Sequence, residues 1–185
     1  MKKYKVIALI GPSGSGKDTV LKEVLKKAKN VNKIVNCTTR PQRQGETHGK
    51  DYYFLTQEEF TNKLLDGELI EATSFRDWFY GTDIDNLSEE KINIGIFNPA
   101  AINILIDNSK LDLVIYYVTA KSKTRLLRQL NREENPNVEE IVRRYQADGK
   151  DFSNLDFSFI CLMNEDESNL LKNVEEILGT IDQWN

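Results

Sequence analysis

Residues 4–28, YKVIALIGPSGSGKDTVLKEVLKKA, decide the fold, because they join an apolar run to a glycine-rich turn and then to an amphipathic segment. The apolar run 4–10 is short and ends at Gly11, which predicts a buried strand. Residues 16–29 repeat apolar side chains at helical spacing, which predicts a helix with one buried face. A strand, a glycine-rich turn and a helix in this order are typical of a parallel α/β sheet.

The turn between this strand and this helix has the spacing of a phosphate-binding loop, with four residues between Gly11 and Gly16-Lys17. In such a loop several backbone N–H groups and a helix N-terminus point at one anion, and the lysine adds a full positive charge. The sequence therefore predicts nucleotide binding by Gly11, Ser13, Gly14, Ser15, Gly16, Lys17, Asp18 and Thr19. The alternative is a Gly-Ser loop ahead of an ordinary helix.

Asp18 stands where the pattern expects a serine or threonine whose hydroxyl contacts Mg²⁺. A carboxylate also serves a hard cation, directly or through water, so Asp18 is our candidate metal ligand. The alternative is an acidic residue that is favoured in a first helical turn by the helix dipole.

Strands and helices alternate along most of the remaining chain, which favours an α/β fold with a doubly wound parallel sheet. Further strands are expected at 34–37, 51–56, 68–75, 77–82, 92–98, 111–119 and 156–163. Further helices are expected at 57–67, from Pro99 onward, and at 121–133, 138–148 and 166–182. We divide this single domain into three parts. The core is formed by residues 1–35, 83–120 and 145–185. A strand-rich substrate-binding insertion covers 36–82, and a helical lid covers 121–144.

Composition limits the class of protein. Two cysteines in 185 residues provide neither a disulfide framework nor a zinc set, and they are interpreted as core thiols, Cys37 and Cys161. The apolar run after the basic start is too short for a signal sequence, and no run is long enough to cross a membrane. We expect a soluble cytoplasmic protein with neither a membrane nor a nucleic acid as partner.

Charge is unevenly distributed around a formal net charge of −4. Residues 1–33 have a net charge of +7, 119–150 of +3 and 151–185 of −7. Solvated helix faces explain most of this pattern, while a minority of the basic residues is expected to gather at a small-molecule anion site.

Residues 38–54, TTRPQRQGETHGKDYYF, place Arg40 and Arg43 three positions apart in a glycine-containing loop. Such a pair can hold a phosphate through charge-assisted, bidentate hydrogen bonds, and Tyr52 adds a hydroxyl donor. Taken alone, the segment is better interpreted as a solvated basic loop.

The phosphate loop, this arginine loop, Ile70-Glu71 and Tyr80-Gly81-Thr82 together closely resemble the guanylate kinase family. The family pattern TTR-x-x-R-x-GE-x-x-G-x-DY-x-F is complete here, and the resemblance covers nearly the whole chain. It implies a P-loop kinase that uses ATP and Mg²⁺ to phosphorylate GMP, with dGMP as a second candidate acceptor, and that is a monomer or a homodimer.

The resemblance also implies residue roles. Arg40, Arg43, Tyr52 and Tyr80 match positions that hold the GMP phosphate, Glu46 the acid that supports them, and Glu71 and Thr82 the base-reading pair. Arg128, Arg132 and Arg144 resemble flap arginines that reach the transferring phosphate, with Arg143 as an alternative to Arg144, and Asn164 matches a contact on the adenine side of ATP. The catalytic set is then Lys17, Arg40, Arg128, Arg132 and Arg144.

The sequence departs from the family at two substrate-binding positions. Asn36 replaces a serine near guanine O6, and its amide can still donate there. Asn98 falls at the second acid of a strand-end Asp-x-Asp, and the first acid is lost. The Lys17-Asp18 pair resembles ribose 1,5-bisphosphate phosphokinases, so a different acceptor, either that sugar phosphate or another nucleoside monophosphate, remains an alternative. A non-catalytic guanylate-kinase-like binding module is the third hypothesis.

Glu71 has a direct chemical reason to read guanine. Guanine presents two donors, N1–H and N2–H, on one edge, and an ionised carboxylate can accept both, whereas adenine N1 is an acceptor. Elsewhere, Trp78 and Trp184 are interpreted as packing residues, and His48 as a solvated loop residue.

Overall fold

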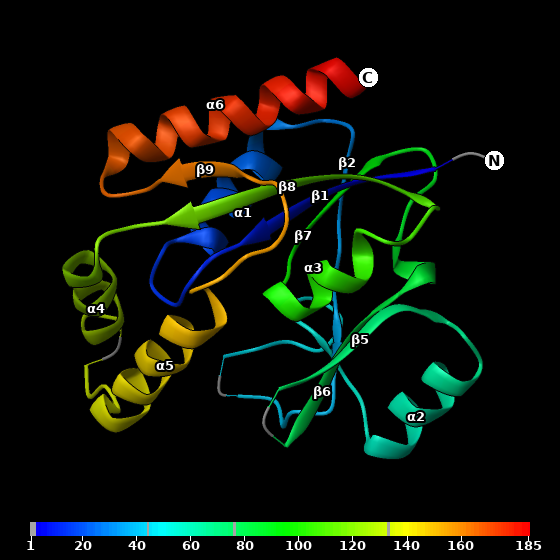
Figure 1. Cartoon of the computed structure of the whole chain (residues 1–185), viewed down its shortest axis with the longest axis horizontal. Helices are drawn as coiled ribbons and strands as arrows, with labels where there is room; N and C mark the ends of the chain where they lie inside the picture. Colours follow the sequence, from blue (N-terminus) through cyan, green and yellow to red (C-terminus); the bar gives the residue numbers. More distant parts are fainter. Residues whose placement is uncertain (1–2, 44, 76, 133) are drawn as a thin grey trace.

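The computed structural model describes residues 3–43, 45–75, 77–132 and 134–185 (Figure 1). Its elements in chain order are β1 (Tyr4–Ile10), α1 (Lys17–Lys27), β2 (Val31–Lys33), β3 (Cys37–Thr38), β4 (Tyr53–Phe54), α2 (Gln57–Leu65), β5 (Leu69–Phe75), β6 (Trp78–Asp83), η1 (Ile84–Asn86), β7 (Ile92–Ile96), α3 (Pro99–Leu105), β8 (Leu111–Thr119), α4 (Ser122–Leu130), α5 (Val138–Asp151), β9 (Ile160–Met163) and α6 (Glu167–Trp184).

The central sheet has the strand order β2-β7-β1-β8-β9, and its strand pairs are parallel. Helices α1 and α6 pack on one face, and α3 packs on the other (Figure 1). Strand β1 lies in the middle because both faces of its apolar run are buried, with Ile7 and Leu9 on the α1 and α6 side and Val6 and Ala8 on the α3 side. The predicted doubly wound α/β fold is confirmed.

A second sheet, in the order β4-β3-β6-β5, stands below the central one in Figure 1, with α2 beside it. Strands β5 and β6 form an antiparallel pair whose register sets Glu71 opposite Thr82. Helix α2 begins at a capping box in which Thr56 and Glu59 satisfy each other's backbone N–H groups. The register of β5 and β6 therefore fixes two predicted base-reading residues side by side.

One strand prediction is wrong, and others are too long. The expected strand 34–37 is a crossing segment between sheets, because β2 ends at Lys33 in the central sheet and β3 begins at Cys37 in the second. The expected strand 156–163 is paired only over Ile160–Met163. Cys37 is buried as predicted, but Cys161 is exposed, because β9 is an edge strand and turns this side chain to solvent.

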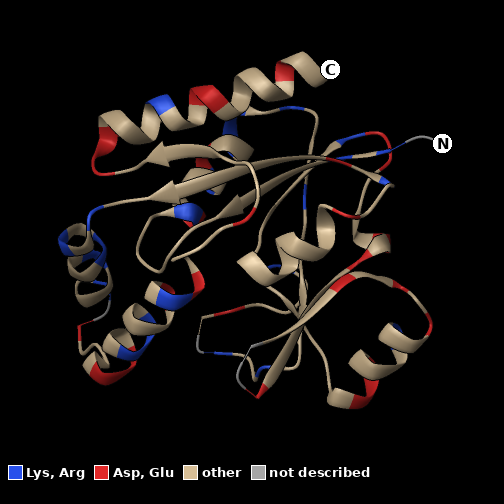
Figure 2. Cartoon of the chain, in the orientation of Figure 1, with Lys and Arg blue, Asp and Glu red and all other residues tan. Residues whose placement is uncertain are grey.

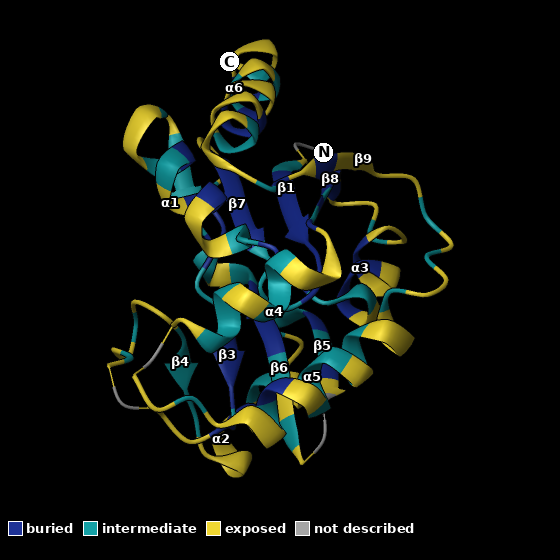
Figure 3. Cartoon of the chain, turned by 90° about the vertical axis from the view of Figure 1, so that its left-hand side faces the viewer, coloured by how far each residue is buried: buried dark blue, intermediate teal, exposed yellow. Residues whose placement is uncertain are grey.

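Charged residues and buried residues are distributed differently over the elements of the fold. Figure 2 shows lysines and arginines on α4 and α5 and acidic residues spaced along α6. Figure 3 shows the buried strands of the central sheet, while α6 is exposed along its outer face. None of the described helices has both the length and the apolar composition needed to cross a bilayer.

Gly11 ends β1 with a backbone φ of 147°, and a Cβ at this position would lie 2.0 Å from the Val118 carbonyl oxygen. We expect Gly11→Ala to lower the free energy of unfolding by about 3 kcal/mol or more, because both the backbone and the neighbouring strand must shift. Gly179→Ala is the matched control, since a Cβ there meets nothing within 4 Å in the middle of α6. It should raise stability by about 0.5–1 kcal/mol. Urea denaturation measures both, and a neutral Gly11→Ala would contradict the expected clash.

Candidate active site

The phosphate loop connects β1 to α1, and its free donors face one concavity. Among the described residues, the backbone N–H groups of Gly14, Gly16, Lys17 and Asp18 donate to no protein acceptor, whereas Ser15 N–H donates to the Pro12 carbonyl at 3.2 Å. Lys17 Nζ donates to the Gly11 carbonyl at 2.5 Å and to the Pro12 carbonyl at 3.2 Å. Burial lowers the pKa of the Lys17 amine, against the opposing effect of the Asp18 charge. This arrangement can bind an anion.

Asn164 supports the loop from behind. Its side chain is buried, and Nδ2 donates to the Ser15 carbonyl at 2.8 Å. A Cβ on Gly16 would lie 2.4 Å from the same nitrogen, so only glycine leaves room for this contact. The structure thus places Asn164 against the back of the phosphate loop. Ser15 is also fully buried there, with its hydroxyl unpaired among the described residues.

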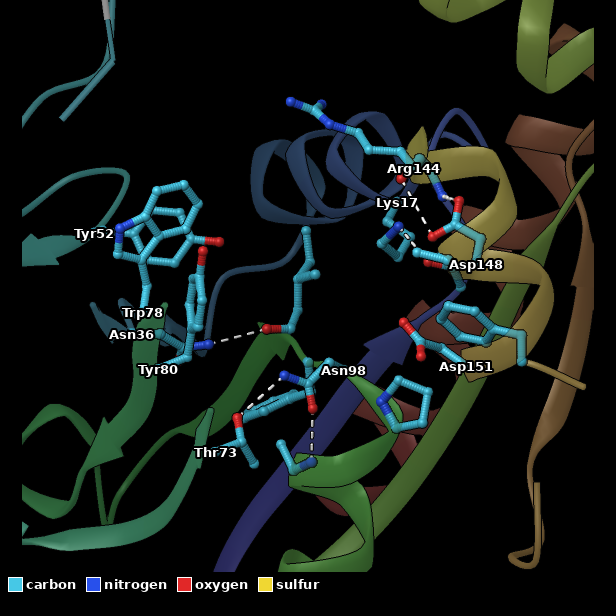
Figure 4. Close-up of a pocket in the computed structure, with 18 of the residues that line it drawn as sticks. Lys17, Asn36, Tyr52, Thr73, Trp78, Tyr80, Asn98, Arg144, Asp148 and Asp151 are labelled. Atoms are coloured by element: carbon cyan, nitrogen blue, oxygen red, sulfur yellow. Dashed lines mark hydrogen bonds between the residues drawn. The ribbon is translucent and has the colours of Figure 1, made fainter. Parts of the chain in front are cut away.

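A cavity of about 310 Å³ lies between the phosphate loop, the second sheet and α5. Lys17 and Asp148 stand on one side of it, and Tyr52, Trp78 and Tyr80 on the other (Figure 4). Of the predicted substrate-binding residues it is lined by Asn36, Arg43, Tyr52, Glu71, Tyr80 and Asn98. The structure therefore brings together residues from five separate stretches of the chain, 11–17, 36–52, 71–80, 96–101 and 144–152.

Glu71 is the buried carboxylate of this cavity, with 4% of the residue exposed. Its Oε1 accepts a hydrogen bond of 2.7 Å from Thr82 Oγ1, while Oε2 has no partner among the described residues. Burial raises the pKa of Glu71 to about 7, although the bond from Thr82 acts in the opposite direction. A ligand that offers N–H donors would satisfy this carboxylate.

Two asparagines of the cavity are already partly engaged. Asn36 Nδ2 donates to the Ile96 carbonyl at 3.0 Å, which leaves its second N–H for a ligand. Asn98 caps α3, because its Oδ1 accepts from Ala101 N–H at 2.7 Å, and its Nδ2 donates to Thr73 Oγ1 at 3.2 Å. Asn98 thus lines the cavity while it holds the start of α3.

The arginine loop is ordered by Glu46. This carboxylate accepts from Arg40 Nη2 at 2.8 Å and from the backbone N–H of Arg43 at 2.8 Å. Burial acts to raise the pKa of Glu46, but the bonds from Arg40 and Arg43 lower it below its usual value. Burial, followed by the charges of Arg40 and Arg144, lowers the pKa of Arg43. These cations therefore act on one another across a common site, which favours an anionic ligand.

Arg40 itself lies behind the cavity wall, since it is only 5% exposed and is absent from the described lining. Its guanidinium lies 5.5 Å from the ring centre of Tyr52, which does line the cavity. Thr82 and Glu46 also lie outside the lining of the two cavities that adjoin the phosphate loop, within the part of the chain that is described. All three contact residues that line the cavity.

A second cavity, of about 780 Å³, opens between the phosphate loop and helices α4 and α5. It is lined by the predicted residues Ser13, Gly14, Gly16, Lys17, Asp18, Thr19, Arg128, Arg132 and Arg144. Arg144 lines both cavities, whereas Arg143 lines neither among the residues described, which favours Arg144 in the predicted register. Arg128 hydrogen-bonds the carbonyls of Gly14, Ser15 and Glu165 at 3.4, 3.3 and 3.0 Å.

Sequence reasoning missed four cavity residues whose side chains can form hydrogen bonds: Thr73, Trp78, Asp148 and Asp151. Trp78, interpreted as a packing residue, lines the cavity beside Tyr80, whereas Trp184 does pack against the core. The position of Trp78 two residues before Tyr80 in a strand was the available signal, since alternate residues share one face. The two aspartates gave none, because they lie in a charged helix of ordinary appearance.

A metal site made by protein alone is absent, since no group of three or more His, Cys, Asp or Glu side chains suited to a metal occurs among the described residues. Asp18 is an exposed carboxylate in the first turn of α1, and it lines the second cavity beside Lys17. A single carboxylate beside a phosphate loop fits Mg²⁺, which keeps several waters and takes further ligands from substrate phosphates.

Comparison with known proteins decides the family. A family model described as guanylate kinase matches residues 3–181. The chain belongs to the guanylate kinase family. This family assignment agrees with the resemblance carried by the phosphate and arginine loops.

Individual guanylate kinases resemble the chain over different extents. The match to guanylate kinase of Thermotoga maritima is 44% identical over 93 residues, and covers 50% of this chain and less than half, 44%, of that protein. The guanylate kinase of Anaplasma phagocytophilum is 30% identical over 179 residues, which are 94% of this chain and 85% of the relative. That of Wolbachia pipientis wMel is 29% identical over 183 residues, 96% and 89% of the two chains.

A solved structure shares the fold. The crystal structure of guanylate kinase from Anaplasma phagocytophilum superposes with a TM-score of 0.73 at 22% identity, and covers 99% of this chain and 87% of that chain. The guanylate kinase fold of the chain therefore extends through both sheets.

Proposed function

We propose that this protein is a guanylate kinase, which transfers the γ-phosphoryl group of ATP to GMP and produces ADP and GDP. One observation carries the proposal: the buried Glu71 carboxylate, with one unpaired oxygen, lines a cavity that also reaches Lys17 of the phosphate loop. A guanine-reading group and a phosphate-binding group in the lining of one cavity suit a guanine nucleotide, and the family membership supports the same activity.

The acceptor is held at both ends. Guanine N1–H and N2–H donate to Glu71, and the free N–H of Asn36 donates to O6. The acceptor phosphate contacts Arg43, Tyr52 and Tyr80. Arg40 and Glu46 lie behind these side chains and hold Tyr52 and Arg43 in place. Residues 36–82 are thus the substrate-binding insertion. The same contacts accept dGMP, since none of them addresses the ribose.

The donor is held by the loop. The free N–H groups and Lys17 bind the ATP phosphates, and Arg128, Arg132 and Arg144 supply positive charge from a lid formed by residues 121–144. Asp18, directly or through water, would hold the Mg²⁺ that ATP carries, and this ion would neutralise developing phosphate charge. The acceptor is already anionic, so no general base is required and catalysis is positioning and charge neutralisation.

An ADP-release assay tests the proposal with MgATP and GMP, dGMP, AMP, UMP or ribose 1,5-bisphosphate as acceptor. GMP should exceed AMP by about 100-fold or more in kcat/KM, because adenine leaves buried polar groups unpaired. Turnover of another acceptor in place of GMP would support the second hypothesis. GMP binding without any turnover would support a non-catalytic binding module.

GMP affinity should depend on the ionisation of Glu71. Its pKa is about 7 in the ligand-free protein, and only the ionised form accepts both guanine donors. Binding should therefore tighten about tenfold from pH 6 to pH 8, because the ionised fraction grows over that range. Titration calorimetry with guanosine isolates the base, because guanosine has no phosphate to titrate. An affinity for guanosine that is equal at pH 6 and pH 8 would contradict this role of Glu71.

A further inference from the structure

Asp148 is a partly buried acidic side chain at the phosphate loop to which none of the proposed roles applies. It lies in the last turns of α5, its side chain is 14% exposed, and it stands beside the loop, on the same side of the cavity as Lys17 (Figure 4). Its Oδ2 accepts from the backbone N–H of Ser13 at 2.7 Å, and its Oδ1 lies 3.4 Å from the Ser13 hydroxyl. A carboxylate beside a site for anions needs a reason, because like charges repel.

The same carboxylate is paired with α4. Arg125 Nη2 lies 3.2 Å from Asp148 Oδ2, and Arg125 Nε donates to the Ser13 carbonyl at 3.1 Å. One helix therefore holds the N–H of Ser13 and the other holds its C=O. Arg125 also lies over the Tyr145 ring at 5.2 Å, which links the two helices to each other.

The phosphate loop and helix α4 are closely packed. A Cβ on Gly14 would lie 2.4 Å from the Arg125 carbonyl oxygen, so α4 approaches the loop as closely as glycine permits. Among the described backbone N–H groups of the loop, only that of Ser13, at the edge of the loop, donates to Asp148. The N–H groups of Gly14, Gly16 and Lys17 stay without a protein acceptor among the described residues. Asp148 thus leaves the central anion-binding donors open.

We propose that Asp148 is a positioning residue for phosphoryl transfer, because its carboxylate fastens α5, and through Arg125 also α4, to the Ser13 peptide of the phosphate loop. Arg144 on α5 and Arg128 on α4 are then held at fixed distances from the donor phosphates. Arg125 neutralises the carboxylate, so that the fastening adds no net charge beside the nucleotide. The role in phosphoryl transfer rests on the proposed kinase activity, whereas the link between the helices and the phosphate loop does not.

The test compares Asp148→Ala, Asp148→Asn and the control Glu139→Ala, an exposed acid at the start of the same helix. Asp148→Ala should lower kcat about 10- to 100-fold and raise the KM for ATP, with little change in the KM for GMP, because misplaced arginines lose the transition state. Asp148→Asn keeps an acceptor for Ser13 N–H and should recover activity to within about threefold of the parent. Glu139→Ala should behave as the parent protein does.

Hydrogen exchange and a fluorescent ATP analogue supply readouts that do not depend on GMP as acceptor. In Asp148→Ala the amides of α4 and α5 should exchange faster while those of α2 and α6 are unchanged, and the analogue should dissociate faster. These two measurements stay informative if GMP proves not to be the substrate, so the two proposals fail separately. A double variant with Arg125→Gln should add little to Asp148→Ala, since both changes break one link.

Two results would overturn the proposal. Unchanged kinetics and unchanged exchange in Asp148→Ala would make the contact incidental. Tighter binding of the ATP analogue in both Asp148 variants would instead mean that the carboxylate competes with the nucleotide phosphates. Thermal unfolding of each variant identifies a general loss of folding, and the asparagine variant, which retains the shape of the side chain, then decides the result.

Discussion

Lys17→Ala should lower kcat for GMP phosphorylation by about 10³-fold or more, while GMP itself still binds. The ammonium group is the full positive charge of the phosphate loop, and loss of one preorganised charge at a transferring phosphoryl group costs this order of rate. Its present partners, the carbonyls of Gly11 and Pro12, lie on the loop itself. The side chain is thus poised to exchange these two bonds for phosphate oxygens.

Calorimetry and steady-state kinetics separate the two expectations for Lys17→Ala. GMP affinity should stay within about threefold of the parent, because Glu71, the residue proposed to bind the base, lies outside the phosphate loop. Lys22→Ala is the matched control, since Lys22 is an exposed lysine on the same helix. Substantial turnover by Lys17→Ala would refute the assignment of Lys17 as the main loop charge.

Glu71→Gln should reduce kcat/KM for GMP by about 100-fold and leave the KM for ATP unchanged. The substitution keeps the shape of the side chain but removes one acceptor, and it turns an amide N–H₂ toward a guanine donor. Burial makes the mismatch expensive, because water cannot replace the lost bond. Glu58→Gln, an exposed glutamate on α2, is the control.

The same substitution should stabilise the ligand-free protein at pH 8. The pKa of Glu71 is raised on folding from 4.5 to about 7, so the folded state holds a proton more tightly than the unfolded state. The stability due to this proton is fully present below pH 4.5 and is lost as pH rises through 7. Glutamine has no charge to bury, and the gain at pH 8 should be on the order of 1–3 kcal/mol. Thermal denaturation that shows Glu71→Gln less stable than the parent at pH 8 would contradict this cost of the ionised carboxylate.

These opposite effects, if measured, would identify Glu71 as a residue kept for binding rather than for folding. The ligand-free protein bears an unpaired buried carboxylate oxygen, and the guanine donors are what would satisfy it. Stability sacrificed at a binding site is a common property of enzymes. The pH dependence of guanosine binding and the stability of Glu71→Gln then report the same ionisation from two sides.

Features that short segments encode could be predicted from the sequence. The run 4–10 and Gly11 require a buried strand with a sharp end, and the spacing to Lys17 requires a loop of open N–H groups. The arginine loop could be recognised because all fixed positions of its motif lie within residues 38–54, so the order of residues along this short segment is sufficient. Chain alternation then predicted the parallel sheet, since parallel strands need long crossover connections, which are usually helices.

Which side chains lie together at the site became known from the packing of the folded chain. Arg40 proved to lie behind the cavity, Trp78 proved to line it, and the expected strand 34–37 proved to be a passage between two sheets. Asp148 meets Ser13 across 135 positions of sequence, and no local pattern marks either residue for the other. The physical reason is that a motif sets backbone shape and charge over a few residues, whereas contacts between distant residues follow from how helices and sheets pack.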